Sequence, residues 1–361
     1  MALCAKQNET TCNPSGNNGD SDASGWSQQA LYAACTQCPR SCKIDRASGK
    51  RGFCAENADL RIAVACLHFG EEPLITVHGG SGTIFLTGCN LRCAFCQNYQ
   101  ISQQGMGRAV TKQEFAEICL RLQDAGAENI NLVTGSHHIP VLAEGLSEAR
   151  RQGLTLPVCW NSSGYDSPEM LALLDGLVTI YLPDLKTLSP VLSRQLCAAE
   201  DYAEKAKAAL KWMISHNPLK IVEVEKKGEK KEKMLQGVII RHLFLPGRFD
   251  ETAAVLDWLK NNADGKAIIS LMSQYTPVPF KDTESELARR TKALSAIENR
   301  LVNKSEDADL QDLIAAYDFE YLFYQDLSDD TSWLPDFTRT QPFSNALAKP
   351  LWHWRDGFLN D

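Results

Sequence analysis

The chain has 361 residues, 44% of them hydrophobic, and a net charge of −8. This composition is typical of a globular protein, and the negative charge argues against a nucleic-acid partner, which would need a basic face. No apolar run approaches the roughly 20 residues that span a bilayer, so we expect no membrane contact. Residues 1–29 lack an apolar segment and an Arg-rich pattern. We expect them to be a disordered leader of a cytoplasmic protein.

Six short apolar, β-branched runs alternate with helical patterns from residue 83 onward. The expected strands are TIFLTG (83–88), NINLV (129–133), LPVCW (156–160), VTIYL (178–182), GVIIRHLFL (237–245) and AIISLM (267–272). Between them we expect helices over 112–126, 141–153, 167–176, 193–212 and 251–262. Strands that alternate with helices predict a parallel sheet covered by helices. Six units are too few for a closed eight-stranded barrel, so we predict a partial (β/α)6 TIM-like barrel.

The same pattern divides the chain into regions. We expect a Cys-rich N-terminal cap over residues 30–79, the barrel over 80–280, and a helical and irregular C-terminal extension over 281–361. The lysine- and glutamate-rich stretch 219–236 predicts a solvated hairpin tip or a flexible insert, and a docking patch is the alternative.

Thirteen cysteines in a chain with no export signal do not predict disulfides. Seven of them form two groups: Cys89, Cys93 and Cys96, and Cys35, Cys38, Cys42 and Cys54. Four more lie in apolar contexts, where a buried structural cysteine is the default: Cys66, Cys119, Cys159 and Cys197.

The first group, Cys89, Cys93 and Cys96, lies directly after the first expected strand. Carboxyl ends of parallel strands are where reactive groups gather. Structural zinc usually takes four protein ligands, whereas three thiolates can hold a 4Fe–4S cluster and leave one iron open. The alternative is a zinc site completed by a remote histidine such as His68 or His78, but neither has metal-ligand spacing to the loop.

The Cys-x3-Cys-x2-Cys pattern after a strand, with Phe95 before the third cysteine, resembles the radical S-adenosylmethionine (SAM) superfamily. Four further segments resemble motifs of the pyruvate formate-lyase activating enzymes: NSSGY (161–165), YLPDLK (181–186), IIRHLFLPG (239–247) and LMSQYTP (271–277). Residues 30–280 are most similar to an activating enzyme-like, PflX-type branch. That branch carries CPRxC, then GSGTIF, then the cysteine loop followed by QNYQIS.

The resemblance implies that the open iron chelates SAM and that reductive cleavage yields a 5′-deoxyadenosyl radical, which abstracts hydrogen. Asp184 and Lys186 would contact SAM, and Arg241 would pair with its carboxylate. Further contacts implied are Asn161, Ser162, Ser163, His242 and Thr134. A structural ion pair is the alternative for Asp184 with Lys186, and a core histidine is the alternative for His242.

The chain departs from the superfamily at one motif. Many members have Gly-Gly-Glu after the second strand, where the carboxylate binds the SAM amino group. Here the strand ends VTGSHH (133–138), and Thr134, Ser136 or His137 could substitute.

The second group, Cys35, Cys38, Cys42 and Cys54, lies among Arg40, Arg46, Lys50 and Arg51, whose charges favour thiolates. Four thiols predict a closed metal site, and zinc and a second iron–sulfur cluster fit it equally. Zinc would fold the cap, whereas a second cluster could relay electrons. Free thiols are the third reading. Glu71 and Glu72, which follow this cap, are expected at the surface or a hinge.

Together these features predict a radical SAM enzyme, with a reductant such as flavodoxin or ferredoxin and a glycyl-radical protein or peptide as substrate. One alternative is radical modification of another macromolecule or metabolite. The other, from a different class, is a non-enzymatic iron–sulfur electron carrier.

Overall fold

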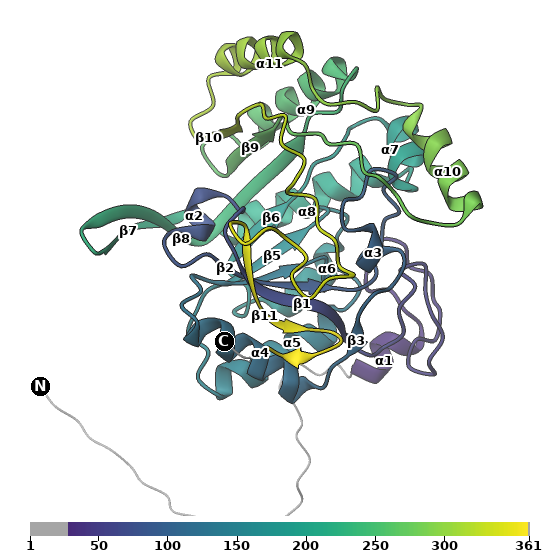
Figure 1. Ribbon diagram of the computed structural model, residues 1–361, viewed down its shortest axis with the longest axis vertical. Coiled ribbons are helices and arrows are strands. Elements are labelled where there is room, and N and C mark those ends of the chain that lie inside the picture. The colour runs from purple at the N-terminus through teal and green to yellow at the C-terminus, as the bar shows by residue number, and fades with distance from the viewer. Residues whose placement is uncertain (1–27, 360–361) are drawn as a thin grey trace, which may run out of the picture.

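The computed structural model describes residues 28–359 and has one mixed sheet at its centre (Figure 1). All six predicted strands are present and pair in parallel in chain order. They are β2 (Ser81–Leu86), β4 (Ile130–Val133), β5 (Val158–Ser162), β6 (Ile180–Pro183), β8 (Glu229–Leu243) and β9 (Ile268–Met272). Within the described residues the outermost strands do not pair with each other, so the partial-barrel prediction is confirmed.

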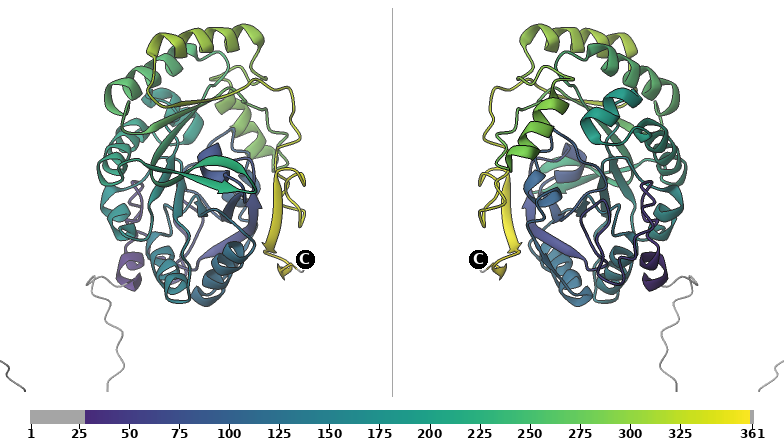
Figure 2. Two further views of the ribbon diagram at one scale, coloured as in Figure 1. Left: turned by 90° about the vertical axis from the view of Figure 1, so that its left-hand side faces the viewer. Right: turned by 90° about the vertical axis from the view of Figure 1, so that its right-hand side faces the viewer.

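Helices cover one face of this sheet (Figure 2). They are α4 (Lys112–Asp124), α5 (Ile139–Arg151), α6 (Pro168–Leu171) with a 3₁₀ turn (Ala172–Leu174), α7 (Pro190–Cys197), α8 (Tyr202–His216) and α9 (Phe249–Asn262). The segment 193–212, expected to be mostly helical, is helical but divided between α7 and α8. Ala198 ends α7 in a left-handed conformation (φ 57°), and α8 begins at Tyr202.

Strand residues alternate between the two faces of the sheet. Leu132, Trp160 and Ile240 lie in the apolar core shared with the helices. Because successive side chains point to opposite faces, Asn131 and Arg241 lie on the concave face, away from the helices. The lower part of that face is apolar, since Leu74 and Ile75 of α2 (Pro73–Thr76) pack there against strand residues.

Further strands join the sheet, one from within the barrel region (β3) and the others from the two flanking regions. They are β1 (Arg61–His68), β3 (Arg108–Ala109), β10 (Leu322–Gln325), β11 (Ala348–His353) and β12 (Gly357–Phe358). β1 and β11 are antiparallel to their neighbours, whereas β10 extends the parallel part beyond β9. The sheet therefore reaches into the regions assigned to the cap and the C-terminal extension, and residues 348–353 form a strand in the tail expected to be irregular.

The C-terminal region crosses the open side of the sheet. After α10 (Glu284–Leu294) and α11 (Lys304–Tyr317), the chain forms β10 at one edge and β11 beyond β1 at the other. We call the connection, residues 326–347, the strap; it passes in front of the sheet in Figure 1. Its Phe337 and Phe343 pack on Phe85 of β2, with ring centroids 5.6 and 5.3 Å away. The strap therefore walls one side of the concave face.

The charged stretch 219–236 forms a hairpin that projects from the body (Figure 1). β7 (Lys220–Lys226) pairs with the first half of β8 through a two-residue turn at Lys227 and Gly228, both with positive φ, which suits a hairpin. Lys233 Nζ anchors it to Glu128 Oε2 at 2.7 Å. The hairpin reading is therefore confirmed. None of the helices within residues 28–359 is long and apolar enough to cross a membrane.

Candidate functional site

The three-cysteine loop follows the carboxyl end of β2 and is held by its backbone. The amides of Arg92 and Ala94 donate to the carbonyls of Cys197 and Leu196 at the end of α7, at 3.1 and 2.8 Å. Gly88 has a positive φ (74°), and a Cβ there would lie 2.7 Å from the carbonyl oxygen of Cys54. Two of the thiols also have nearby partners: Cys89 Sγ accepts from the Leu91 amide at 3.3 Å, and Cys96 Sγ lies 3.3 Å from Ser102 Oγ. A short helix, α3 (Tyr99–Ser102), follows the loop.

The electrostatics of the loop single out Cys93. Burial raises the pKa of the Cys89 thiol and that of Cys96. The pKa of Cys93 is instead lowered to about 7, chiefly because its thiolate accepts a hydrogen bond from the Cys197 thiol, with help from Lys186. Cys197, read from sequence as an ordinary core cysteine, therefore belongs to this site. Because Cys197 is far from the loop along the chain, the sequence does not indicate its contact with Cys93.

This donor set fits an iron–sulfur cluster with an open iron. Within residues 28–359 no three His, Cys, Asp or Glu side chains are grouped as a site for a single metal ion. The two histidines considered as extra ligands are engaged elsewhere: His68 packs on Phe343, with centroids 5.0 Å apart, and His78 lies 3.5 Å from Glu229. The zinc alternative therefore loses its proposed fourth ligand.

The concave face gathers polar side chains at the ends of β5, β6 and β8. Asp184 accepts from Arg241 Nε at 2.9 Å and from Lys186 Nζ at 2.6 Å. Burial alone would raise the pKa of Asp184, but the charges of Arg241 and Lys186 outweigh it and hold that pKa below its usual value. Arg241 Nη2 also donates to Asn161 Oδ1 at 2.6 Å. The structure thus brings four of the predicted SAM contacts into one network.

Three other predicted contacts lie around this network. Ser162 Oγ donates to Asp166 Oδ2 at 2.5 Å, on the helix-facing side, and so is occupied. Ser163 Oγ is buried and has no hydrogen-bond partner among residues 28–359. Thr134 has a φ of 63°, a conformation that a β-branched residue rarely adopts. Such strain often marks functional positions, and here it falls where the superfamily motif would begin.

His242 is placed differently from the other predicted contacts. Its ring nitrogens are bonded to the Leu185 carbonyl at 2.7 Å and to Thr252 Oγ1 at 2.9 Å, and it is 2% exposed. It has the same strand parity as Ile240 and faces the helices. The structure therefore favours the core-histidine alternative.

Glu71 and Glu72 do not lie at the surface, and that expectation is wrong. β1 runs beside β2 and delivers the following loop into the barrel, where Glu71 Oε2 lies 3.6 Å from Arg241 Nη1. Burial raises the pKa of Glu72 to about 7, although Arg241 opposes the rise. Glu72 Oε2 is buried and lacks a hydrogen-bond partner within the described part of the chain.

The second cysteine group also converges. Cys35, Cys38 and Cys54 are buried, and a Cβ at Gly52 would lie 3.2 Å from Cys42 Sγ and 3.6 Å from Cys54 Sγ. Burial raises the pKa of Cys38 to about 12, and the charges of the other three thiols act in the same direction. Within the described part of the chain, however, no three of these side chains lie close enough together to hold one metal ion, so the closed metal site stays a prediction. Three non-glycine residues here have positive φ: Ser41, Lys43 and Ala55.

The cap that carries this group, with α1 (Gln28–Ala33) at its start, packs directly on the three-cysteine loop. Arg40 Nε donates to the Asn90 carbonyl at 2.9 Å, and Arg46 Nη1 donates to the His137 carbonyl at 2.6 Å. His137 Nε2 in turn lies 2.8 Å from the Thr87 carbonyl. His137 therefore joins the cap to the barrel, and burial lowers its pKa to about 3.

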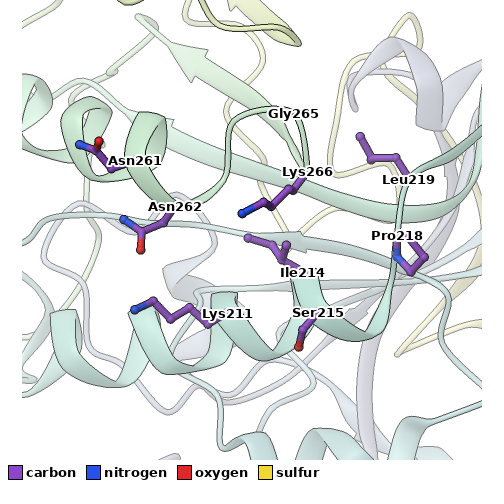
Figure 3. Close-up of a pocket in the computed structure, with 9 residues that line it drawn as sticks. All are labelled: Lys211, Ile214, Ser215, Pro218, Leu219, Asn261, Asn262, Gly265 and Lys266. Atoms are coloured by element: carbon purple, nitrogen blue, oxygen red, sulfur yellow. The ribbon is translucent and has the colours of Figure 1, made fainter.

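A hollow of about 630 Å³ lies at the other end of the sheet (Figure 3). It is bounded by α8, by the end of α9 and by the turn before β9, and its polar lining includes Lys211, Asn261 and Lys266. These side chains are exposed. Because β9 is parallel to β2, its amino end lies away from the cysteine loop, and the hollow is not part of the site.

Comparisons with known proteins identify the superfamily of the chain. Residues 83–259 match the model of the radical SAM superfamily. The chain is 31% identical to the uncharacterized protein MJ0674 of Methanocaldococcus jannaschii over 68% of this chain and 67% of that protein. The chain belongs to the radical SAM superfamily.

Solved structures show more distant likenesses. SuiB of Streptococcus suis bound to its precursor peptide SuiA is 13% identical, over 66% of this chain and 46% of that chain, with a TM-score of 0.43. A domain of a pyruvate-formate lyase-activating enzyme from Bacteroides vulgatus is 10% identical, over 52% of this chain and 91% of that chain, with a TM-score of 0.34. The chain thus spans less than half of SuiB.

Proposed function

We propose that this protein is a radical SAM enzyme that abstracts hydrogen from a protein or peptide backbone, as activating enzymes of glycyl-radical proteins do. The observation that carries the chemistry is the three-thiol loop facing the Asp184–Lys186–Arg241–Asn161 network. A 4Fe–4S cluster held by Cys89, Cys93 and Cys96 would supply one-electron cleavage of bound SAM.

The chain's own residues bind and orient SAM in this proposal. Arg241, a planar cation with several donors, would bind the SAM carboxylate, and Asp184 holds its guanidinium in place. Lys186 lies between Asp184 and the thiol of Cys93, so its charge stabilises both anions. An electron carrier needs no such network, which disfavours that alternative.

The strap would shield the reaction from water. Phe337 is fully buried, and its backbone amide donates to Gln100 Oε1 at 2.8 Å. Gln100 belongs to α3, directly after the cysteine loop, so the strap is tied to the loop itself. Exclusion of water protects a reactive radical from side reactions.

The four-cysteine group would hold a second metal, zinc or an iron–sulfur cluster. Its contacts with the three-cysteine loop through Arg40 and Gly88 support an electron relay if it holds a cluster, and a structural role if it holds zinc. Metal and sulfide analysis of protein purified without oxygen distinguishes the two.

The proposed chemistry is tested by anaerobic reconstitution with iron and sulfide, reduction, addition of SAM and assay of 5′-deoxyadenosine. We expect product from the native protein and none from the Cys89/Cys93/Cys96 triple-alanine variant. A cluster-loaded protein that neither binds nor cleaves SAM would contradict the proposal.

The substrate is tested separately, because it rests on motif resemblance. Electron paramagnetic resonance (EPR) after incubation with pyruvate formate-lyase should show a glycyl radical. If SAM is cleaved but no glycyl-radical partner acquires a radical, the activating role is wrong and another macromolecule or metabolite is the substrate.

A further inference from the structure

One part of the SAM site lacks an obvious protein partner. After β4 the chain reads Thr134-Gly135-Ser136, so no carboxylate follows that strand. His137 does not replace it, because its ring is bonded to the Thr87 carbonyl and its own carbonyl to Arg46. A carboxylate that binds the SAM amino group would therefore come from another element of the chain.

Glu71 is held at the concave face with one oxygen occupied. Its Oε1 accepts from Asn131 Nδ2 at 3.2 Å and from Asn161 Nδ2 at 3.5 Å. Its Oε2 has a single close cationic neighbour, Arg241 Nη1 at 3.6 Å. Two amides thus orient the carboxylate, and Oε2 lies beside the guanidinium that would bind the SAM carboxylate.

We propose that Glu71 binds the amino group of SAM, with Arg241 on the carboxylate. This inference rests on the proposed function. In an α-amino acid the two charged groups share one carbon, so their protein partners must lie side by side. Glu71 and Arg241 meet that requirement, since Glu71 Oε2 lies 3.6 Å from Arg241 Nη1, although β2, β4, β5 and β6 lie between β1 and β8 in the sheet.

The local pairing of charges supports an ammonium group beside Glu71. The charged groups that act on one another here are Glu71, Glu72 and Asp184, with Arg241 and Lys186. Asp184 accepts hydrogen bonds from both cations, at 2.9 and 2.6 Å, whereas Glu71 Oε2 lies 3.6 Å from Arg241 Nη1. A buried carboxylate without a close partner is costly. The ammonium group of bound SAM would give Glu71 such a partner, while the SAM carboxylate would pair with Arg241.

The test is binding to cluster-loaded protein, with Glu71→Gln as the isosteric neutral variant. The probes are SAM and 5′-methylthioadenosine, which lacks the amino-acid group. We expect Glu71→Gln to weaken SAM binding about tenfold or more and to leave methylthioadenosine binding within twofold, since a hydrogen bond to a charged group is lost only with SAM. Glu72→Gln is the matched control from the same loop, and we expect it to change SAM binding less than threefold.

The desamino analogue of SAM separates this role from a structural one. The loss of affinity from SAM to its desamino analogue should be larger in the native protein than in Glu71→Gln, because the variant already lacks the partner of the amino group. Equal penalties, or an equal loss of both probes in Glu71→Gln, would overturn the assignment. If native protein binds no SAM at all, the proposed function fails as well. If Glu71→Gln does not fold, the same comparison is made with Glu71→Asp, where SAM should weaken and methylthioadenosine should not.

Discussion

The two cysteine groups lie against each other, yet their surroundings differ. The three-cysteine loop faces a polar concave surface, with Lys186 and Asp184 close to Cys93. The four-cysteine group is enclosed by its own loop, with Arg46 Nη1 3.5 Å from Cys35 Sγ. Three thiols beside a polar surface are therefore suited to an open catalytic site, whereas four thiols within one loop are suited to a closed site.

The largest effect is expected at the three-cysteine loop. Alanine at Cys89, Cys93 or Cys96 should lower 5′-deoxyadenosine formation by about a thousandfold or more, because an open cluster has no spare ligand. Product assay with iron counting checks this. If any of the three variants retained a tenth of the native activity, that cysteine would not be an essential ligand of the catalytic cluster.

A different effect is expected at the four-cysteine group. If this group holds the metal that we propose, Cys38→Ser should release it and lower Tm by roughly 5–10 °C, because a structural site contributes folding energy. The optical signal of the catalytic cluster should remain. Loss of both metals together would show that the two groups are one functional unit.

The polar network should matter for affinity more than for folding. Arg241→Lys keeps the charge but removes the planar fork, and we expect SAM to bind roughly 10–100-fold more weakly. Titration of cluster-loaded protein measures this. Glu128→Gln, which removes the charge that pairs with Lys233 and leaves an amide oxygen to accept from the Gly79 amide, is the matched control.

A smaller effect is expected at Cys197, whose thiol donates to Cys93. Cys197→Ala should keep the cluster but make its reduction potential more negative, since hydrogen bonds to ligand sulfur tune the potential. Redox titration followed by EPR measures the shift. An unchanged potential would show that Cys197 only packs.

The last prediction concerns the pH dependence of stability. The folded-state pKa of Glu72 is raised to about 7, so its neutral form stabilises the fold at low pH and this contribution is lost as pH rises toward 7. Glu72→Gln should therefore match native stability near pH 4 and exceed it by up to about 3 kcal/mol at pH 8. Urea unfolding from pH 4 to pH 8 measures the free energy of unfolding of both proteins. A stability advantage of Glu72→Gln that decreased as pH rises would contradict the prediction.

Sequence pattern was sufficient for the repeating part of the fold. Six strands and their helices follow from periodicity, and Asp184, Lys186, Arg241 and Asn161 converge because parallel strands end at one edge. Strand parity alone could also have separated His242 from Arg241, since adjacent residues face opposite sides.

The remainder depended on contacts between distant segments. β10 (Leu322–Gln325) is as long as β4 and β6 but lies outside the repeating strand and helix pattern, and it pairs with β9 at the edge of the sheet. The burial of Glu71 depends on Arg241, far along the chain, and on β1 lying beside β2. The sequence around Glu71 predicts neither the contact with Arg241 nor the pairing of β1 with β2.

The central claim is that the three-cysteine loop, and not the four-cysteine group, carries the open iron that binds SAM. The most direct measurement is the EPR spectrum of the reduced, cluster-loaded protein before and after addition of SAM. We predict that SAM changes the cluster spectrum in the native protein and in Cys38→Ser, and that Cys93→Ala shows no SAM-dependent change. A native spectrum unaffected by SAM, or a SAM-dependent change that survives Cys93→Ala and disappears in Cys38→Ser, would contradict the account.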